Sequence, residues 1–457
     1  MLLRFGVSNH RSIREYQEIN FTASSLKDSE EGLLSLDKES NDPAEATAIS
    51  KIKLLPVVAI YGSNAAGKST VLNALDFFVD LIVRSYNRVA ESSGSPYFPF
   101  MLDEASRKAV SSYDVDFVFD GVRYHFGFKA NGERFTSEWL YAFNLSSKRQ
   151  VRTVLFHRDY EEEEEFYFGS ALKGDNKRLV KSVRPNCLYI SVAAQNSHPL
   201  LSKIYNYFIG KVSTKLEVGV NKLRLSKQLN KFFSDNEGAK QKAFEFLKSA
   251  DIGVGDLEFR SVERDEDTLN LLQDVKQIFA KHFEERNFDA FEESNQLEAR
   301  LLHHGEDGKL YPIELMDEST GTLALLQLMG PVITALAKGG VLIVDELNIS
   351  LHPVVAREVV RLFSSPETNP GQAQLFFTTH DTGMLTDGLL RRDQIWFVEK
   401  NSFGATKLFP LSDVKVRATD NFEKGYIEGR FGATPLFNRF KSSFRVNFSD
   451  DEVKGEE

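Results

Sequence analysis

Short apolar runs with strand-like spacing dominate the first part of the chain. Residues 54–61 form an apolar run typical of a buried strand, and residues 70–79 follow with helical spacing. Period-two alternation over residues 114–128 is interrupted at Asp120 and Gly121, which predicts a β-hairpin. Further strands are expected in three places, at residues 2–21 around a turn at 9–12, at 137–144 and at 151–156. The pattern thus predicts a buried strand and helix next to antiparallel strands.

The pattern becomes mainly helical near residue 200. Helices are expected at residues 201–208 and 239–248, and residues 269–283 place an apolar stripe on one helical face. We expect this stripe to pack against its own domain rather than a partner. From residue 299 the chain returns to a strand, a hairpin and then alternating helices and strands, and it ends in an acidic tail. This alternation predicts an α/β fold class.

Composition and charge limit the classes of function. The chain has 457 residues and a formal net charge of -10, which argues against a broadly basic nucleic-acid surface but leaves a local patch open. The single cysteine, Cys187, lies in an apolar run and is expected to be a buried, inert thiol. No signal peptide is evident, and no run approaches about 20 apolar residues. We therefore expect a soluble, cytoplasmic protein.

The segment GSNAAGKST has the form G-x-x-x-x-G-K-[ST] of a phosphate-binding loop. It comprises Gly62, Ser63, Asn64, Ala65, Ala66, Gly67, Lys68, Ser69 and Thr70. The two glycines allow the backbone to approach phosphate oxygens, and the following helix adds its positive end. Lys68 is expected to contact the β- and γ-phosphates, and the Ser69 hydroxyl to bind Mg²⁺. The strand and helix on either side strengthen this interpretation.

A second apolar strand, residues 341–346 with the sequence VLIVDE, ends in two carboxylates. Asp345 is expected to hold Mg²⁺ through water, and Glu346 to polarise the attacking water as a general base. An Asp-Glu strand end is weak evidence alone, but together with the phosphate-binding loop it predicts an ATPase that uses ATP and Mg²⁺.

Two further segments suggest which class of ATPase this is. Ser319, Gly321 and Thr322 begin a helical run at residues 323–336, so free N–H groups there offer a second anion site. His380 ends the strand 374–379, where its ring can donate a hydrogen bond to a γ-phosphate. Taken alone, a histidine such as His380 is more often structural, but the order of the motifs along the chain favours a functional role.

This order of motifs resembles the ABC-type ATPase heads of the SMC and RecF class. The resemblance implies that two heads sandwich ATP, with Ser319, Gly321 and Thr322 acting across the dimer and Glu346 and His380 acting within their own subunit. Residues 348–353 would form the dimer-facing loop. Gln195, expected to end a strand at 186–194, is the candidate for the glutamine that senses Mg²⁺, although a buried strand and polar loop would look the same. Thr320 stands where the family has a second small residue, which leaves the geometry of the signature open.

The resemblance also implies an architecture, an ABC-ATPase head with a mixed sheet around the phosphate-binding loop, an antiparallel β lobe and a helical insertion. The expected parts are an N-terminal ATPase lobe at 1–200, a helical insertion at 201–300, a C-terminal ATPase lobe at 301–445 and an acidic tail at 446–457.

Residues 7–13, the S-x-G-T signature, Leu351-His352-Pro353 and residues 425–435 resemble a narrower group, the bacterial OLD-like and anti-phage ATPases. A C-terminal Toprim nuclease is not evident, and the His303-His304 pair and residues 265–267 are expected to be solvated loops. The resemblance to PARIS-type and abortive-infection ATPases implies a homodimer, with a higher homo-oligomer open, that responds to a phage-derived trigger and works with a separate effector, expected to be a nuclease.

Three alternatives remain open from the sequence. A RecF-type or SMC-like DNA-repair head would bind DNA more tightly with ATP, and the acidic composition counts mildly against it. A transporter ATPase subunit would need a docking groove for a membrane partner. A degenerate scaffold that does not hydrolyse ATP is disfavoured by the intact Lys68, Asp345 and Glu346.

Overall fold

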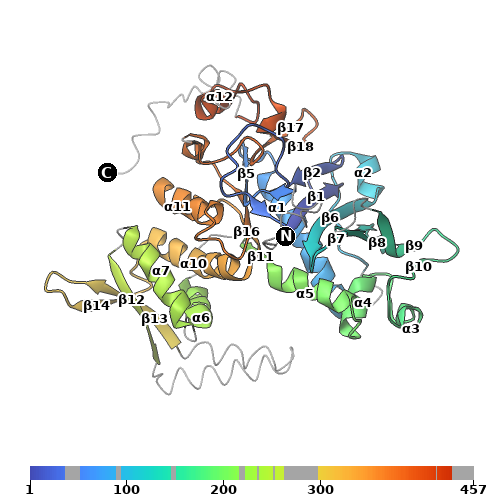
Figure 1. The fold of residues 1–457 in the computed structure, drawn as a ribbon, viewed down its shortest axis with the longest axis horizontal. Coiled ribbons are helices and arrows are strands. Elements are labelled where there is room, and N and C mark those ends of the chain that lie inside the picture. Colours follow the sequence, from blue (N-terminus) through green and yellow to red (C-terminus); the bar gives the residue numbers. More distant parts are fainter. Residues whose placement is uncertain are drawn as a thin grey trace, which may run out of the picture.

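The computed structural model combines two large β-sheets with helices between and around them (Figure 1). It describes residues 1–36, 52–88, 94–145, 151–215, 222–233, 236–250, 253–261, 297–386, 388–417 and 419–434. The predicted helix at 269–283, the acidic residues 265–267 and the tail at 446–457 lie outside the described residues. Within them the predicted α/β class is confirmed, with a mixed sheet and an antiparallel sheet.

The central sheet carries the predicted nucleotide-binding strands. Its order is β11-β15-β16-β5-β17-β18, and only the last pair is antiparallel. The strands are β5 (Val57–Gly62), β11 (Val212–Lys215), β15 (Gly340–Val344), β16 (Ala373–Thr378), β17 (Ile395–Lys400) and β18 (Thr406–Pro410). All residues of β5 and β16 are buried, which explains the continuous apolar run of β5 and the mainly apolar sequence of β16. The carboxyl ends of β5, β15 and β16 meet at one edge, where the motifs lie.

The N-terminal lobe is a seven-stranded antiparallel sheet in the order β10-β9-β8-β7-β6-β1-β2. Its strands are β1 (Leu2–Ser8), β2 (Gln17–Asn20), β6 (Ser111–Phe119), β7 (Val122–Ala130), β8 (Phe135–Asn144), β9 (Arg152–Asp159) and β10 (Phe166–Phe168). The hairpin predicted around Asp120 and Gly121 joins β6 to β7, and both turn residues have positive φ. A short pair, β3 (Leu34–Ser35) and β4 (Lys53–Leu54), lies outside both large sheets.

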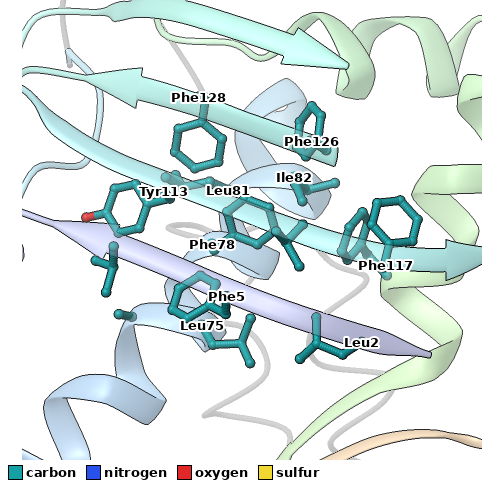
Figure 2. Packing of buried hydrophobic residues seen from close by; sticks show 14 of the residues in the cluster. Leu2, Phe5, Leu75, Phe78, Leu81, Ile82, Tyr113, Phe117, Phe126 and Phe128 are labelled. Atoms are coloured by element: carbon teal, nitrogen blue, oxygen red, sulfur yellow. The ribbon is translucent and has the colours of Figure 1, made fainter. Parts of the chain in front are cut away.

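Helix α1 (Lys68–Arg84) links the two sheets through an aromatic core (Figure 2). Phe78 of α1 is fully buried among rings from the antiparallel sheet. Its ring stacks on Phe128 at 5.3 Å between centroids and meets Phe5 and Phe126 edge-on or tilted. Buried Gln374 of β16 also bonds both backbone groups of Leu2, so the first strand is fixed to the central sheet. The start of α1, which carries Lys68, is therefore held from both sides.

The other helices complete the core. They are α2 (Glu104–Lys108), α3 (Asn176–Val180), α4 (Tyr189–Gln195), α5 (Leu201–Lys211), α6 (Lys222–Phe233), α7 (Glu237–Ser249), α10 (Thr320–Lys338), α11 (Pro353–Ser364) and α12 (Phe422–Ile427), with 3₁₀ turns at Ser85–Asn87, Thr382–Leu385 and Leu411–Asp413. By length and hydropathy alone α10 could cross a membrane, but 67% of its most apolar window is buried inside the structure. It therefore serves as a core helix, packed beside α6, α7 and β15.

The segment predicted as a helical insertion, residues 201–300, contains strands as well as helices among the described residues. Helix α5 packs on α1 and α4, and β11 pairs in parallel with β15 at the edge of the central sheet. After α6 and α7 come β12 (Val254–Ser261), β13 (Leu297–His304) and β14 (Leu310–Glu314), a three-stranded antiparallel sheet. Helices α6 and α7 and the strands β12, β13 and β14 lie on one side of the molecule in Figure 1, and the seven-stranded sheet lies on the other. Residues 201–215 thus belong to the ATPase body.

The strand predicted at 186–194 is wrong, because the segment forms α4 instead. Its apolar residues would suit a buried strand, but a buried carboxylate stabilises a helix start. Glu138 of β8 accepts hydrogen bonds from the N–H groups of Tyr189, at 2.6 Å, and Ile190, at 3.0 Å. Burial raises the pKa of Glu138 to about 7, although Arg158 and these bonds oppose the rise. A contact 50 residues away in sequence thus outweighs local strand propensity.

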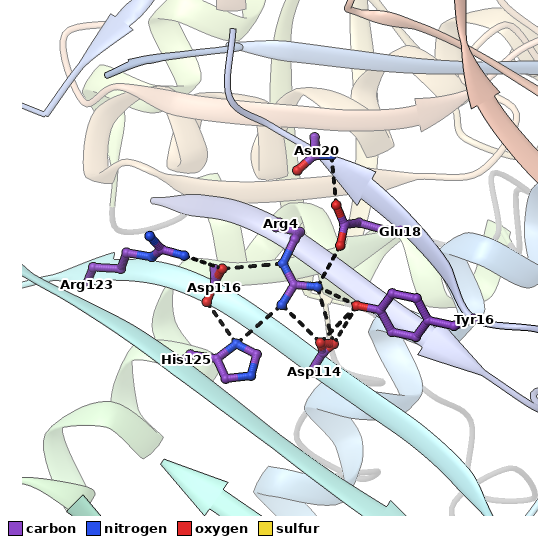
Figure 3. Close-up of polar contacts among 8 residues, drawn as sticks. All are labelled: Arg4, Tyr16, Glu18, Asn20, Asp114, Asp116, Arg123 and His125. Atoms are coloured by element: carbon purple, nitrogen blue, oxygen red, sulfur yellow. Dashed lines mark hydrogen bonds and ion pairs between the residues drawn. The ribbon is translucent and has the colours of Figure 1, made fainter. Parts of the chain in front are cut away.

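Arg4 lies at the centre of a polar cluster on the seven-stranded sheet (Figure 3). Its guanidinium forms ion pairs with Asp114 at 3.0 Å, Asp116 at 3.3 Å and Glu18 at 2.9 Å. Asp116 also pairs with Arg123 and His125. The cluster joins β1, β2, β6 and β7 on one face, which fixes the N-terminal strand to the hairpin.

We expect Asp116→Asn to remove a pH-dependent part of the stability. Burial alone would raise the pKa of Asp116, but His125 and Arg123 lower it to about 2. The folded-state pKa lies below the unfolded one, so the carboxylate stabilises the fold above about pH 4 and this contribution is lost toward about pH 2. The difference in unfolding free energy between wild type and variant should be about 2 kcal/mol near neutral pH and shrink below about pH 4.

Urea titrations at several pH values measure that difference. Asp120→Asn is the matched control, because Asp120 is an exposed turn residue of the same hairpin and asparagine also tolerates positive φ. A difference that stays constant as the pH falls would contradict the proposed role of Asp116.

Candidate functional site

The phosphate-binding loop connects the end of β5 to the start of α1 as predicted. Gly67 precedes the helix with φ of 113°, a left-handed conformation that favours glycine. A Cβ atom there would lie 2.3 Å from the Thr406 hydroxyl, so the loop needs glycine for space as well. Because the first N–H groups of a helix have no partner within it, the start of α1 offers donors to an anion.

Lys68 is buried at the first position of α1. Its ammonium group donates hydrogen bonds to the carbonyls of Gly62 at 3.0 Å and Ser63 at 3.2 Å. Burial lowers the pKa of Lys68, while nearby Glu346 and Asp345 act in the opposite direction. The ammonium group thus lies within the loop and close to Glu346, the predicted general base, and Asp345, the predicted magnesium ligand.

Asp345 and Glu346 follow β15 at the same sheet edge. Thr378, the last residue of β16, joins them, because its hydroxyl donates to the Asp345 carboxylate and accepts from the Glu346 N–H at 2.7 Å. Glu346 has φ of 51°, which is uncommon for a residue other than glycine. The backbone therefore turns sharply at Glu346, so the carboxylates of Asp345 and Glu346 occupy different positions although the residues are adjacent in sequence.

His380 is coupled to the loop that follows Glu346. The side-chain oxygen of Asn348 accepts hydrogen bonds from the Thr379 hydroxyl at 2.9 Å and the His380 N–H at 3.3 Å. Partial burial and the charge of Lys68 lower the pKa of His380, while Glu346 and Asp345 oppose this. The ring is therefore neutral near pH 7 and can donate a hydrogen bond from one nitrogen.

These parts enclose one cavity of about 460 Å³. Eight predicted residues line it, namely Asn64, Ala65, Gly67, Lys68, Ser69, Thr70, Glu346 and His380. Gly62, Ser63 and Ala66 belong to the same loop but do not line the cavity. Asp345 is also set back, where it meets Thr378. The structure thus brings together motifs that are far apart in the sequence.

The residues fit a magnesium nucleotide. Lys68 and the start of α1 provide positive charge and N–H donors for phosphate oxygens. Ser69 lines the cavity and Asp345 stands beside it, which are the hydroxyl and carboxylate oxygen ligands that Mg²⁺ prefers. Such an ion would neutralise phosphate charge, and these two residues would hold it.

Ser319, Gly321 and Thr322 do not line this cavity. Ser319 caps α10, with its hydroxyl accepting from the Thr322 N–H at 3.1 Å. Ser319 and Thr320 are exposed. A Cβ on Gly321 would lie 3.0 Å from the Ser350 carbonyl, so the helix start touches the loop after Glu346. The predicted second anion site is therefore open to solvent at Ser319 and Thr320 and lies outside the cavity of its own chain.

Gln195 does not join the site. It is the last residue of α4 rather than the end of a strand, and its side-chain amide donates to the Tyr205 hydroxyl at 3.3 Å. It is also absent from the lining of the cavity. The predicted role as a magnesium ligand is not supported, because the helix places this residue beside α5.

The sequence reasoning missed three residues that line the cavity, Arg11, Ser12 and Lys400. Arg11 and Ser12 lie in the turn after β1, and Lys400 ends β17. Ser12 bonds the hydroxyls of Thr70, at 3.2 Å, and Thr406, at 2.8 Å. The sequence predicts a turn at residues 9–12 and a family resemblance over residues 7–13, but no spacing rule predicts that this turn or Lys400 meets the phosphate-binding loop.

Comparison with known families agrees with this geometry. Residues 57–191 and 213–386, more than half of the chain, match the family described as "AAA domain, putative AbiEii toxin, Type IV TA system". The chain belongs to this family. The predicted membership of a P-loop ATPase family is thereby confirmed, and the narrower resemblance to OLD-like and PARIS-type proteins stays a prediction. The matched ranges of this AAA-domain family include the phosphate-binding loop, Glu346 and His380.

No curated protein matches the chain. Solved structures similar to it include the "SMC head domain from Thermotoga maritima", with 13% identity and a TM-score of 0.39. Another is the "SmcHead bound to the C-winged helix domain of ScpA", with 13% identity and a TM-score of 0.37. Each alignment covers 91% of this chain and 99% of the other. Both TM-scores are low, and the family assignment therefore rests on the sequence match.

Proposed function

We propose that this chain binds ATP with Mg²⁺ in the cavity around Lys68 and hydrolyses it. The observation that carries the proposal is the meeting of the phosphate-binding loop, Glu346 and His380 in one cavity. Membership of an AAA-domain family supports it independently. The test measures the rate of phosphate release from ATP by the purified chain with magnesium present. The same rate is measured for the variants Glu346→Gln and Lys68→Ala.

Each residue has a separate part in the proposed reaction. Lys68 and the start of α1 bind and orient the phosphates. Glu346 accepts a proton from the attacking water, and neutral His380 donates a hydrogen bond to the phosphate that is cleaved. Bound Mg²⁺ supplies charge neutralisation, and Ser69 and Asp345 would hold it.

We also propose that ATP joins two copies of the chain. Ser319 and Thr320 are exposed and do not line the phosphate cavity of their own chain, as expected if this helix start completes the partner's site. Apolar side chains beside them are exposed too, with Met316 at 63% and Ile349 at 40%. Exposed apolar residues next to a polar helix start are typical of an interaction surface. A higher homo-oligomer remains compatible with such a dimer.

We expect Ser319→Asp to prevent ATP-dependent pairing. Aspartate caps a helix as well as serine does, so α10 should keep its start, but the new charge would face the triphosphate. Light scattering should show a dimer of the wild type with magnesium and ATP and a monomer of the variant. Ser319→Asn is the matched control, because asparagine caps without charge and should pair like the wild type. Dimers of Ser319→Asp that form equally well would show that this surface does not face the nucleotide.

In the cell, we propose, this ATP-controlled dimer acts as a sensor and scaffold in anti-phage defence. The family description, which names a toxin of a toxin–antitoxin system, supports that setting. A phage-derived trigger would change the balance between dimeric and monomeric forms of the chain. A separate effector would respond, and the resemblance to PARIS-type and abortive-infection ATPases suggests that this effector is a nuclease. We propose that this takes place in the cytoplasm.

A further inference from the structure

An apolar groove opens directly beside the phosphate cavity. Its volume is about 430 Å³, within the usual range for small-molecule sites. The groove shares Arg11, Ser12 and Lys400 with the phosphate cavity, so the two spaces are adjacent. The remaining lining residues are Tyr97, Phe98, Pro99, Phe100, Met101, Leu102 and Gly404.

Large apolar side chains in this groove are exposed. The exposed fractions are 45% for Phe98, 55% for Met101 and 68% for Leu102. Three such residues within one short segment form a patch that a ligand would cover favourably. The Arg11 guanidinium lies 5.5 Å from the centroid of the Phe98 ring, at the border between the groove and the phosphate cavity.

The groove is fixed to the turn that carries Arg11. The Arg11 N–H donates to the Phe98 carbonyl at 2.7 Å, and the buried Asn9 side chain accepts from the Phe100 N–H at 2.9 Å. The Asn9 amide also donates to the carbonyls of Ser106 and Ala109. These bonds form the groove without a ligand, so little ordering is needed on binding.

We propose that this groove holds the base of the nucleotide whose phosphates bind beside Lys68, and that it does not distinguish adenine from guanine. The inference rests on the proposed nucleotide site. The base would stack and pack against Phe98, Met101 and Leu102, contacts that any purine can make. The shared border at Arg11 places such a base next to its own phosphates.

The lack of selectivity follows from the polar groups around the groove. Selecting adenine requires an acceptor for its amino group, whereas guanine presents an oxygen there. None of the lining residues is Asp, Glu, Asn or Gln, and Arg11 and Lys400 can only donate. The remaining polar side chains are the hydroxyls of Ser12, bonded to Thr70 and Thr406, and of Tyr97, which donates to the Ala109 carbonyl. A hydroxyl can accept from the adenine amino group or donate to the guanine oxygen, so neither side chain selects one purine. A site without a side chain that recognises only adenine or only guanine cannot strongly reject either purine.

Competition binding with magnesium tests the proposal on the full chain, with ATP, GTP and inorganic tripolyphosphate as probes. We expect ATP and GTP to bind within about threefold of each other, and both about tenfold or more tighter than tripolyphosphate. The double variant Met101→Ser with Leu102→Ser should weaken ATP and GTP by about tenfold and leave tripolyphosphate unchanged. Phe403→Ser is the matched control, because Phe403 is 71% exposed but does not line the groove.

A preference for ATP over GTP of more than about thirtyfold would overturn the claim of non-selectivity. An unchanged ratio of ATP to tripolyphosphate affinity in the double variant would show that the base binds elsewhere. If tripolyphosphate and ATP both fail to bind the wild type, the proposed nucleotide function fails, and this inference fails with it. Binding of tripolyphosphate as tight as that of ATP would overturn the base groove alone.

Discussion

Glu346→Gln should reduce ATP hydrolysis by at least about a hundredfold while ATP still binds. Glutamine keeps the shape of the side chain but cannot accept a proton from water. Lys68 and the loop are unchanged, so phosphate binding should persist, and the ATP-bound dimer should accumulate because its turnover is blocked. Steady-state phosphate release gives the rate, and light scattering of the same samples gives the dimer.

Glu358→Gln provides the control for that experiment. Glu358 is a partly exposed residue of α11 that pairs with Arg361, and the same chemical change there should leave turnover unchanged. Hydrolysis by Glu346→Gln at the wild-type rate would show that another group activates the water. The position of Glu346 at a sharp turn, with its N–H bonded to Thr378, would then need another explanation.

Lys68→Ala should weaken ATP binding by at least about a hundredfold. The ammonium group is the buried cation of the loop, and in the structure it bonds only backbone carbonyls among the contacts described, at Gly62 and Ser63. Phosphate oxygens are stronger acceptors for a buried cation than neutral carbonyls. Calorimetric titration with ATP measures the affinity, and turnover should fall in parallel.

Thermal unfolding separates lost binding from a lost fold in this variant. Lys108→Ala removes an exposed lysine that pairs with Glu104 on α2 and should bind ATP like the wild type. If Lys68→Ala folds and keeps the wild-type affinity, the phosphates do not bind at this loop.

Much of the site could be predicted because its motifs depend on local sequence. The loop needs glycine where φ is positive, at Gly67. The buried strands β5 and β15 have continuous apolar runs, and β16 is mainly apolar. Parallel strands bring their carboxyl ends to one edge, so Lys68, Glu346 and His380 could be placed together before the structure was known. The hairpin at Asp120 and Gly121 was likewise set by local turn chemistry.

The remaining features depend on distant contacts. Residues 186–194 satisfy a strand pattern, but Glu138 stabilises a helix there, and Gln195 is thereby carried away from the site. Arg11 and Lys400 line the cavity because packing in the core positions β1 and β17 beside it. The hydrophobic pattern of the sequence does not show where these strands pack. The pairing of β11 with β15 could not be predicted, because a strand of 4 residues is too short to show a pattern.

The most direct measurement is a structure of the Glu346→Gln protein with magnesium and ATP. We predict that the triphosphate binds in the cavity at the start of α1, with its phosphates in contact with Lys68 and close to His380. Ser319 of the partner subunit should contact the same triphosphate from the opposite side. A triphosphate bound elsewhere, or a cavity that stays empty at saturating ATP, would contradict this prediction.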